Sequence, residues 1–419
     1  MILRQVVGNG LRLLTESMPH VRSVSIGVWL TRGSRDEAEA ESGIAHFVEH
    51  MLFKGTGSRS AEDIAQAIDS IGGQLDAFTA KEYASYYIKV LDEHLPLAVD
   101  ILSDIILNPA FREADIQREK KVVLEEIKMV EDTPDDLVHE LFTQGFWEGH
   151  PLGRPILGTR DTVDAFTEAS LRQYFRGTYT ANNIIIAAAG NVNETRVRDL
   201  IEPAFAALPP VGTIVVDRPP TVVPKVLVRN KELEQSHICM GASSYPQNHQ
   251  DRYVSYVLNT LVGGSMSSRL FQNVREKRGL AYAVFSGLAA YRDTGSLTIY
   301  AGCANEAVGE VIDLTVEELR GVKSAPAPEA ELRRAKDHLK GSLMLSLENT
   351  ASRMSHLARQ EIYFDRHFGL DETLEGIEKV TAPDVQRVAS DLLSDDALAG
   401  TVLGPLEGWE YPAARLKLG

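Results

Sequence analysis

Cysteine is nearly absent from this chain. Its 419 residues include only Cys239 and Cys303, which lie in two separate apolar segments. Two such residues exclude a disulfide framework and favour buried thiols in a reducing cytoplasm. Neither cysteine has a second Cys or a His at metal-binding spacing, so the sequence also argues against a thiolate metal site.

Long hydrophobic runs are also missing. No stretch of about 18 consecutive apolar residues occurs, so the sequence predicts no membrane-spanning helix. The start, MILRQVVGNGLRLLTES, has neither the basic and apolar regions of a signal peptide nor the composition of an organellar transit peptide. It predicts instead two short strands around the Asn9-Gly10 turn, and we expect a cytoplasmic protein.

Positive charge is in short supply. The chain has 43 Lys and Arg against 59 Asp and Glu, which gives a formal net charge of −16. This excess argues against nucleic acid as a partner, because its phosphates would be repelled. It favours basic peptides as partners if acidic groups line a cavity, whereas charge spread over the surface would only keep the protein soluble.

The motif that carries most chemistry is His46-Phe47-Val48-Glu49-His50. In a helix, residues four apart share a face, so His46 and His50 point the same way and Glu49 lies beside them. Two neutral imidazoles can bind a catalytic zinc ion, and a nearby carboxylate can take a proton from the attacking water. This order, the reverse of His-Glu-x-x-His, is the inverzincin motif.

A chance pentapeptide on an exposed helix is the competing interpretation of this motif. The rest of the segment is apolar, however, with Phe47, Val48, Met51, Leu52 and Phe53. Unpaired polar groups are costly in such surroundings. The context therefore favours a metal ion as the partner of the three polar side chains.

A catalytic zinc ion usually has three protein ligands and one open position, so a third ligand must come from elsewhere in the first half. A predicted helix over 113–131 carries an apolar stripe of Ile116, Val123, Ile127 and Val130. Glu119 and Glu126 are two turns apart and share a face beside this stripe. Glu125 points about 100° away and is expected to face solvent. Glu126 is thus a candidate ligand, and an ordinary exposed glutamate is the alternative.

The order of the predicted elements indicates an α+β protein. We expect strands over 23–31, 74–80 and 83–91, helices over 60–71, 93–107, 113–131, 134–146 and 162–176, and a buried strand over 184–189. Ser42 is the candidate N-cap of the helix that carries the two histidines. Five prolines between Ala207 and Pro224 exclude a packed helix there. We therefore predict a catalytic domain over 1–207, a linker over 208–224 and a second domain over 225–419.

The second half repeats the first. The run Glu113-Ala114-Asp115-Ile116 has a counterpart that begins at Glu329, 216 residues later, and Gly190 has one at Gly404, 214 residues later. This near-constant offset and the shared order of elements predict a duplicated α+β domain. The second copy lacks the His-x-x-Glu-His motif, so it serves a purpose other than metal binding.

The segment HFVEHMLFKGT at 46–56, followed by VVLEEI with Glu126, resembles the pitrilysin-type zinc peptidases, the inverzincins of family M16. The likeness is strongest to their processing-peptidase branch, which includes the β subunit of the mitochondrial processing peptidase and its bacterial homologues. HPLGRPILGT at 150–159 and SSRLFQNVREKRGLAYAVFSG at 267–287 are also similar to that branch. The resemblance thus covers nearly the whole chain.

The resemblance implies a role for each residue of the predicted site. His46, His50 and Glu126 would bind one Zn²⁺ per chain, and Glu49 would be the general base. Glu119 would be a supporting carboxylate near the metal. Two homologous α/β-sandwich domains would close like a clamshell around a central cavity, and Arg275 and Tyr282 of the second domain would stabilise the oxyanion.

The resemblance also implies how substrate binds. An extended peptide would pair with the exposed edge strand at 74–80, along Asp76, Ala77, Phe78 and Thr79. Many relatives have Asn where this chain has Asp76. A carboxylate keeps a hydrogen-bond acceptor there but removes a donor.

We therefore predict a zinc metalloendopeptidase that hydrolyses peptides or presequence-like segments in extended form inside a closed chamber. The alternative is a non-catalytic scaffold or regulatory subunit of the same fold, like the core proteins of a respiratory complex. Such chains usually lose part of the metal set, whereas every position is filled here. The short Gly263-Gly264 loop lies on the same chain as the metal motif, which favours a homodimer over a heterodimer.

Overall fold

The computed structural model describes residues 2–212 and 218–419, and these form two compact units. Unit 1 contains the described residues within Met1–Met129, Arg154–Asp217 and Ser346–His367. Unit 2 contains those within Val130–Gly153, Arg218–Leu345 and Phe368–Gly419. The chain passes from unit 1 to unit 2 within the predicted linker 208–224, of which residues 213–217 lie outside the described residues. In addition, each half of the chain gives one segment to the other unit.

Unit 1 is built on a six-stranded sheet with the order β1-β2-β6-β3-β5-β4. Its strands are β1 (Ile2–Val6), β2 (Arg12–Ser17), β3 (Ser23–Leu30), β4 (Gln74–Thr79), β5 (Ala84–Leu91) and β6 (Ile184–Gly190). Strands β2 and β6 run parallel, and the other neighbours are antiparallel. Among the described strands, β4 therefore lies at one edge of the sheet, next to β5.

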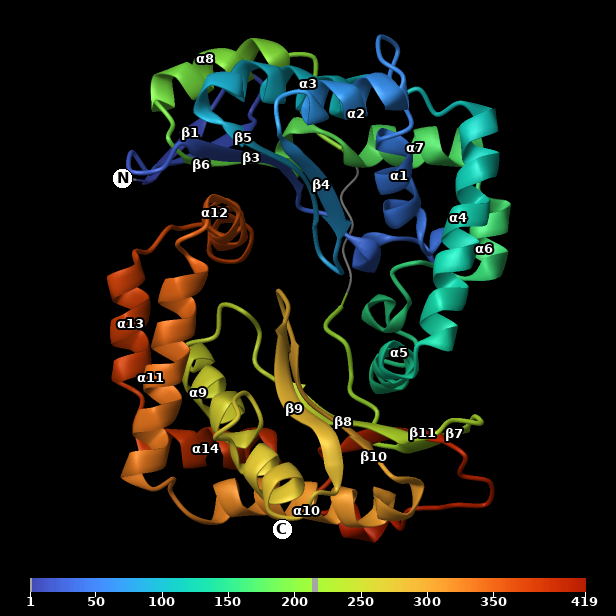
Figure 1. The fold of residues 1–419 in the computed structure, drawn as a ribbon, viewed down its shortest axis with the longest axis vertical. Helices are drawn as coiled ribbons and strands as arrows, with labels where there is room; N and C mark the ends of the chain where they lie inside the picture. The colour runs from blue at the N-terminus through green and yellow to red at the C-terminus, as the bar shows by residue number, and fades with distance from the viewer. Residues whose placement is uncertain (1, 213–217) are drawn as a thin grey trace. The chain divides into compact units, whose positions relative to one another are not determined.

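One face of this sheet is covered by helices from the first half of the chain, α3 and α8 among them (Figure 1). The helices of that layer are α1 (Ile44–Leu52), α2 (Ala61–Asp69), α3 (Leu95–Leu107), α4 (Glu113–Asp132), α6 (Arg160–Ala165), α7 (Glu168–Thr178) and α8 (Glu194–Ala204). The predicted single helix over 162–176 is wrong. Thr159 and Thr167 each cap a separate helix by accepting the N–H of the residue three positions on, so the chain turns between α6 and α7.

Unit 2 repeats this plan with a five-stranded sheet of order β7-β11-β8-β10-β9. Its elements are β7 (Val226–Asn230), β8 (Ser236–Ser244), β9 (Ala281–Ala290), β10 (Gly295–Cys303), β11 (Ala399–Gly404), α9 (Arg252–Val262), α10 (Val308–Ser324), α11 (Glu329–Ser346), α13 (Leu370–Glu378) and α14 (Ala382–Leu392). Read across the sheet, these five strands match β2-β6-β3-β5-β4 of unit 1 strand for strand. Helices α4 and α11 begin at the predicted counterparts Glu113 and Glu329. The predicted duplicated α+β fold is confirmed.

Each sheet has its second face covered by a helix from the other half of the chain. Helix α12 (Thr350–Phe364) packs on β2, β3 and β6 of unit 1, and helix α5 (Pro134–Phe146) packs on β8 and β11 of unit 2. The two helices begin 216 residues apart, so they are also counterparts. On α12, Met354, Leu357 and Ala358 are fully buried against Trp29 and its neighbours. Each half of the chain therefore contributes one helix to the unit that the other half mainly forms.

A charged contact fastens α12 to the N-terminal hairpin. The buried carboxylate of Glu361 accepts hydrogen bonds from Arg4, at 2.8 Å from Nη2, and lies 3.2 Å from His367 Nε2. Burial alone would raise the pKa of Glu361, but His367, Arg4 and Arg12 outweigh it and lower that pKa to about 2. The carboxylate is thus held in its charged form.

Two simpler predictions concern the cysteines and membrane-spanning helices. Both cysteines are unpaired and buried, as expected for a protein without a disulfide framework. In the part of the chain that the structure describes, no helix has the length and apolar character needed to cross a membrane.

Candidate metal centre

The helix that carries the motif, α1, does not begin as predicted. Its N-cap is Gly43, not Ser42, and Gly43 has a φ of +93°, which favours glycine. A Cβ at Gly43 would lie 2.6 Å from the carbonyl oxygen of Leu157, so the loop 154–158 leaves no room for a side chain. The close approach of this distant loop therefore accompanies an N-cap at Gly43 instead of at Ser42, the residue that the local capping rule predicts.

Glu37 takes over the capping of α1 from outside the helix. Its Oε2 accepts the N–H of Gly43 and its Oε1 accepts the N–H of Ala45, both at 2.8 Å. The residue is only 5% exposed, and burial raises its pKa to about 8 against the opposing effect of these two donors. Glu37 thereby fixes the first turn of the helix that presents His46.

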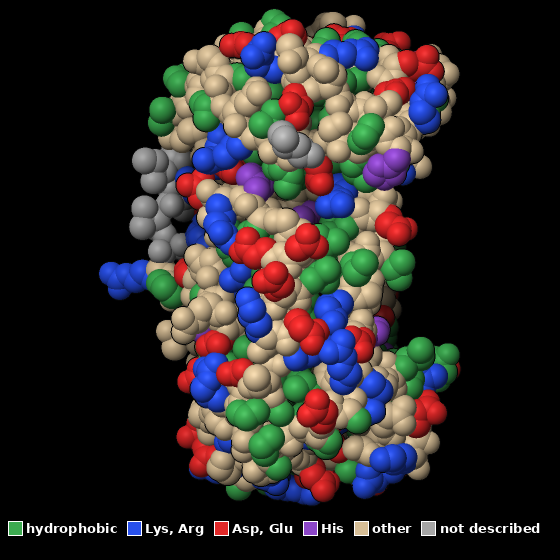
Figure 2. Space-filling model, turned by 90° about the vertical axis from the view of Figure 1, so that its left-hand side faces the viewer, with side chains coloured by type: hydrophobic (Ala, Val, Ile, Leu, Met, Phe, Trp, Pro, Cys, Tyr) green, Lys and Arg blue, Asp and Glu red, His purple; other side chains and the backbone are tan. Residues whose placement is uncertain are grey.

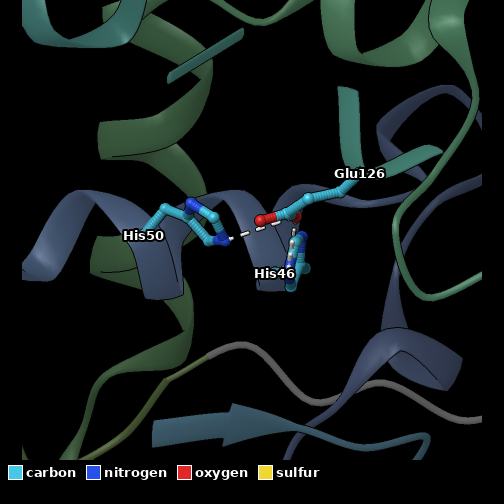
Figure 3. Close-up of side chains that lie close together, drawn as sticks. All are labelled: His46, His50 and Glu126. Carbon is cyan, nitrogen blue, oxygen red and sulfur yellow. Dashed lines mark ion pairs between the residues drawn. The ribbon is translucent and has the colours of Figure 1, made fainter. Parts of the chain in front are cut away.

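The structure brings His46, His50 and Glu126 together. The two imidazoles come from successive turns of α1, and their ring centroids are 4.6 Å apart. Glu126 comes from α4, and its Oε2 lies 3.7 Å from His46 Nε2 and 3.6 Å from His50 Nε2 (Figure 3). One donor atom from each residue falls within 4.8 Å of the others. Glu125 is exposed on the same helix, as expected.

These donors fit a zinc ion. Ligand atoms 2.0–2.2 Å from one tetrahedral ion lie about 3.3–3.6 Å apart, which is close to the separations between Glu126 and the two imidazoles. Burial, and then the neighbouring His50, lower the pKa of His46 to about 3, so this ring is neutral as a ligand must be. Its Nδ1 is buried without a hydrogen-bond partner among the described residues. The site therefore offers two imidazole nitrogens and one carboxylate oxygen to a cation.

Glu119 lies behind His50. Its Oε2 is 3.0 Å from His50 Nδ1, and its Oε1 is 2.8 Å from Lys54 Nζ. Glu119 is 5% exposed, so this pair of contacts is shielded from water. The carboxylate of Glu119 thus contacts the imidazole of His50, and its role as a supporting carboxylate stays a prediction.

Glu49 points from α1 toward the edge strand β4. The hydroxyl of Thr79 donates a hydrogen bond to Glu49 Oε2. Burial raises the pKa of Glu49, although the Thr79 hydroxyl and His50 act in the opposite direction. A carboxyl group with a raised pKa is better matched to proton transfer near neutral pH.

Among residues 2–212 and 218–419, the predicted substrate strand β4 pairs only with β5, so its other edge is unpaired there. The side chains of Asp76 and Phe78 are exposed on it, whereas those of Ala77 and Thr79 turn inward. Asp76 Oδ1 accepts the N–H of Ala77 at 2.8 Å, and its Oδ2 accepts the Tyr87 hydroxyl at 2.9 Å. The carboxylate of Asp76 is thereby held in one orientation.

Arg275 and Tyr282 belong to unit 2. Arg275 lies in a helical turn over Phe271–Glu276, and its guanidinium carbon is 5.0 Å from the centroid of the Tyr282 ring. Tyr282 is 80% exposed on β9, so it is not a core residue of the strand. The two side chains are neighbours, and their role at the substrate stays a prediction.

Sequence reasoning missed Lys54, Glu37 and the side-chain role of Thr79. Lys54 had a signal, because it follows His50 by four residues and such residues adjoin on a helix. Glu37 lies in a loop with no periodicity, so nothing local indicated its contact with α1. Thr79 was predicted only as a substrate-binding residue of the edge strand.

A pair of histidines one helical turn apart, a glutamate from a second helix and a further glutamate held beside them form an arrangement typical of metallopeptidases, carried here on a duplicated α+β fold. Residues 12–160 match the family model described as insulinase (peptidase family M16). Residues 165–339 match the model described as the peptidase M16 inactive domain. The chain belongs to peptidase family M16.

Its relatives carry names that agree with this centre. The chain is 44% identical over 396 residues to the uncharacterized zinc protease YmxG of Bacillus subtilis, covering 94% of this chain and 97% of that one. It is 41% identical over 411 residues to an uncharacterized zinc protease of Mycobacterium tuberculosis, covering 96% and 93%. The relatives support a zinc-dependent peptidase.

Solved structures share the fold. A protease from Helicobacter pylori superposes with a TM-score of 0.89 at 22% identity, over 97% of this chain and 99% of that one. A chain of complex III from Candida albicans gives 0.86 at 20% identity, with full coverage of both chains, at 100% each. At these identities the likeness concerns the fold alone.

Proposed function

We propose that this protein is a zinc metalloendopeptidase that hydrolyses peptides, including presequence-like segments, bound in extended form. The observation that carries the proposal is the convergence of His46, His50 and Glu126 beside a glutamate, Glu49, that a hydroxyl holds in place. Two imidazoles and a carboxylate leave a fourth position open, as in catalytic rather than structural zinc sites. The complete set of side chains disfavours a purely scaffolding subunit.

Each residue of the centre has a separate task in this mechanism. When bound, Zn²⁺ supplies Lewis acidity, which polarises the scissile carbonyl and makes water more acidic. His46, His50 and Glu126 hold the ion. Glu119 accepts the Nδ1–H of His50, so the lone pair of His50 stays on Nε2. Glu49 takes the proton of the attacking water and passes it to the leaving amine.

Substrate would bind as an added strand on β4. An extended peptide could pair with main-chain groups at the edge of β4, and its scissile bond would then lie near Glu49, whose carboxylate contacts Thr79 of the same strand. A folded protein cannot offer a free strand, so short or unfolded chains are the expected substrates. Arg275 and Tyr282 would stabilise the oxyanion.

We further propose that basic peptides are preferred and that the protein acts as a homodimer. On the face drawn in Figure 2, acidic and basic side chains are interspersed, so that face offers no patch of a single sign. Selection by charge would then act at the site itself, where Asp76 is exposed on the edge strand. The homodimer follows from one chain carrying both the metal motif and the Gly263-Gly264 loop.

The function is tested by digesting a library of short, unstructured peptides and mapping the cuts by mass spectrometry. We expect cleavage within peptides that stops when a chelator removes zinc and returns when Zn²⁺ is restored. A compact disulfide-bonded protein, added as a control, should stay intact. If zinc-loaded protein cleaves no peptide in the library, the proposed function is wrong.

A further inference from the structure

Lys54 lies at the back of the metal centre, where neither the motif nor the predicted site includes it. It follows the end of α1 at Leu52 by two residues and His50 by four. Its Nζ lies 2.8 Å from Glu119 Oε1, and its side chain is 35% exposed. Lys54 therefore reaches the ligand His50 only through Glu119.

In the described part of the chain, each oxygen of the Glu119 carboxylate contacts one side chain. Oε1 contacts Lys54, and Oε2 contacts Nδ1 of His50 at 3.0 Å. A carboxylate with a single partner rotates easily about its last bond, because that torsion has broad, shallow minima. The ammonium group occupies one oxygen and so leaves the other aimed at the imidazole. Lys54 is thus placed to fix the orientation of the carboxylate that contacts the His50 ring.

We propose that Lys54 is a positioning residue of the metal centre, which holds Glu119 so that His50 presents Nε2 to the ion. The inference rests on the proposed zinc site and adds a residue to it. Partners of metal-bound histidines typically contribute 10–100-fold to metal affinity, because they fix the tautomer and the direction of the ring. Lys54 would support His50 indirectly, because it contacts Glu119 and Glu119 contacts His50.

An ordinary surface ion pair is the competing explanation, since such pairs contribute little. The same chain provides the comparison. Lys128 pairs with Glu125 on α4, where the glutamate side chain is 70% exposed. The side chain of Glu119 is 6% exposed, so its contact with Lys54 is far less screened by water. The two lysines differ in what their partners touch, because Glu119 contacts a predicted ligand and Glu125 does not.

The experiment uses the full chain with the variants Lys54→Met, Lys54→Arg and Lys128→Met. Methionine keeps the apolar stem of Lys54 and removes its charge. Zinc affinity is measured by competition with a fluorescent chelator, and the melting temperature is measured on protein freed of metal. We expect about a 10–100-fold weaker zinc affinity for Lys54→Met, near wild-type affinity for Lys54→Arg, and no change for Lys128→Met.

The melting temperature separates positioning from folding. Lys54→Met leaves the buried carboxylate of Glu119 without its cation, so the melting temperature of the metal-free protein should fall, and zinc affinity is measured well below that temperature, where the variant is folded. If Lys54→Met binds zinc within about twofold of the wild type, well under the effect expected of such a partner, or if Lys128→Met loses as much affinity, the inference is overturned while the proposed function stands. If the wild type binds no zinc, both are overturned. Should Lys54→Met fail to fold, affinity of Lys54→Arg far below wild type would also contradict the inference.

Discussion

The substitution Glu49→Gln is expected to abolish peptide hydrolysis while zinc stays bound. Glutamine has the size of glutamate, and its amide oxygen can still accept the hydrogen bond of the Thr79 hydroxyl. It cannot take a proton from water, so the rate should fall by about 10²–10⁴-fold, the usual worth of a general base. The measurements are kcat on a peptide found in the digest and zinc content by atomic emission.

The matched control is Glu125→Gln, which removes a glutamate that is exposed on α4 beside the ligand Glu126. This control should keep wild-type activity and zinc. Residual activity of Glu49→Gln above a tenth of the wild type would contradict the assignment of Glu49 as general base. Loss of zinc in Glu49→Gln would show instead that Glu49 helps to bind the metal.

Separate expression of residues 1–217 and 218–419 is expected to give two insoluble fragments. The first fragment lacks α12, which buries Met354 and Leu357 on the sheet of unit 1, and the second lacks α5, which buries Phe142 and Phe146 on the sheet of unit 2. Each fully buried side chain of this size contributes about 1.5–3 kcal/mol. Without its exchanged helix, each sheet would expose a contiguous apolar face, which promotes aggregation.

Co-expression of the two fragments should restore a soluble complex, because each then supplies the helix that the other lacks. Solubility, the near-ultraviolet circular dichroism of fixed aromatic side chains and binding of a hydrophobic dye are the measurements. A 1–217 fragment that is soluble alone and unfolds cooperatively would contradict the account of the exchanged helices. The same result would support the simpler division at the predicted linker 208–224.

The parts of the fold that sequence could predict are those set by local periodicity. The four-residue spacing of His46 and His50 fixes their common face in any helix. The apolar stripe of α4 buries Ile116 and Val123 and turns Glu126 toward α1 while Glu125 faces solvent. The constant offset between the halves predicted the second sheet, because two copies of one pattern adopt one topology.

The parts that sequence could not predict depend on contacts between distant segments. Ser42 satisfies the local rule for an N-cap, but the loop 154–158 approaches Gly43 too closely for any side chain. Glu37 reaches the first turn of α1 from a loop without periodicity. A periodic pattern identifies the apolar face of a helix such as α5 or α12 but does not state which sheet that face covers. The sequence therefore did not predict that these two helices are exchanged between the units.

The most direct test of the account is the zinc content of the purified protein after exposure to Zn²⁺ and dialysis. The account predicts about one zinc ion per chain for the wild type and for Glu125→Gln. It predicts almost none for Glu126→Gln, because that variant loses the carboxylate that lies 3.7 Å and 3.6 Å from the two imidazoles. A wild-type protein without zinc, or a Glu126→Gln protein with a full equivalent, would contradict the account.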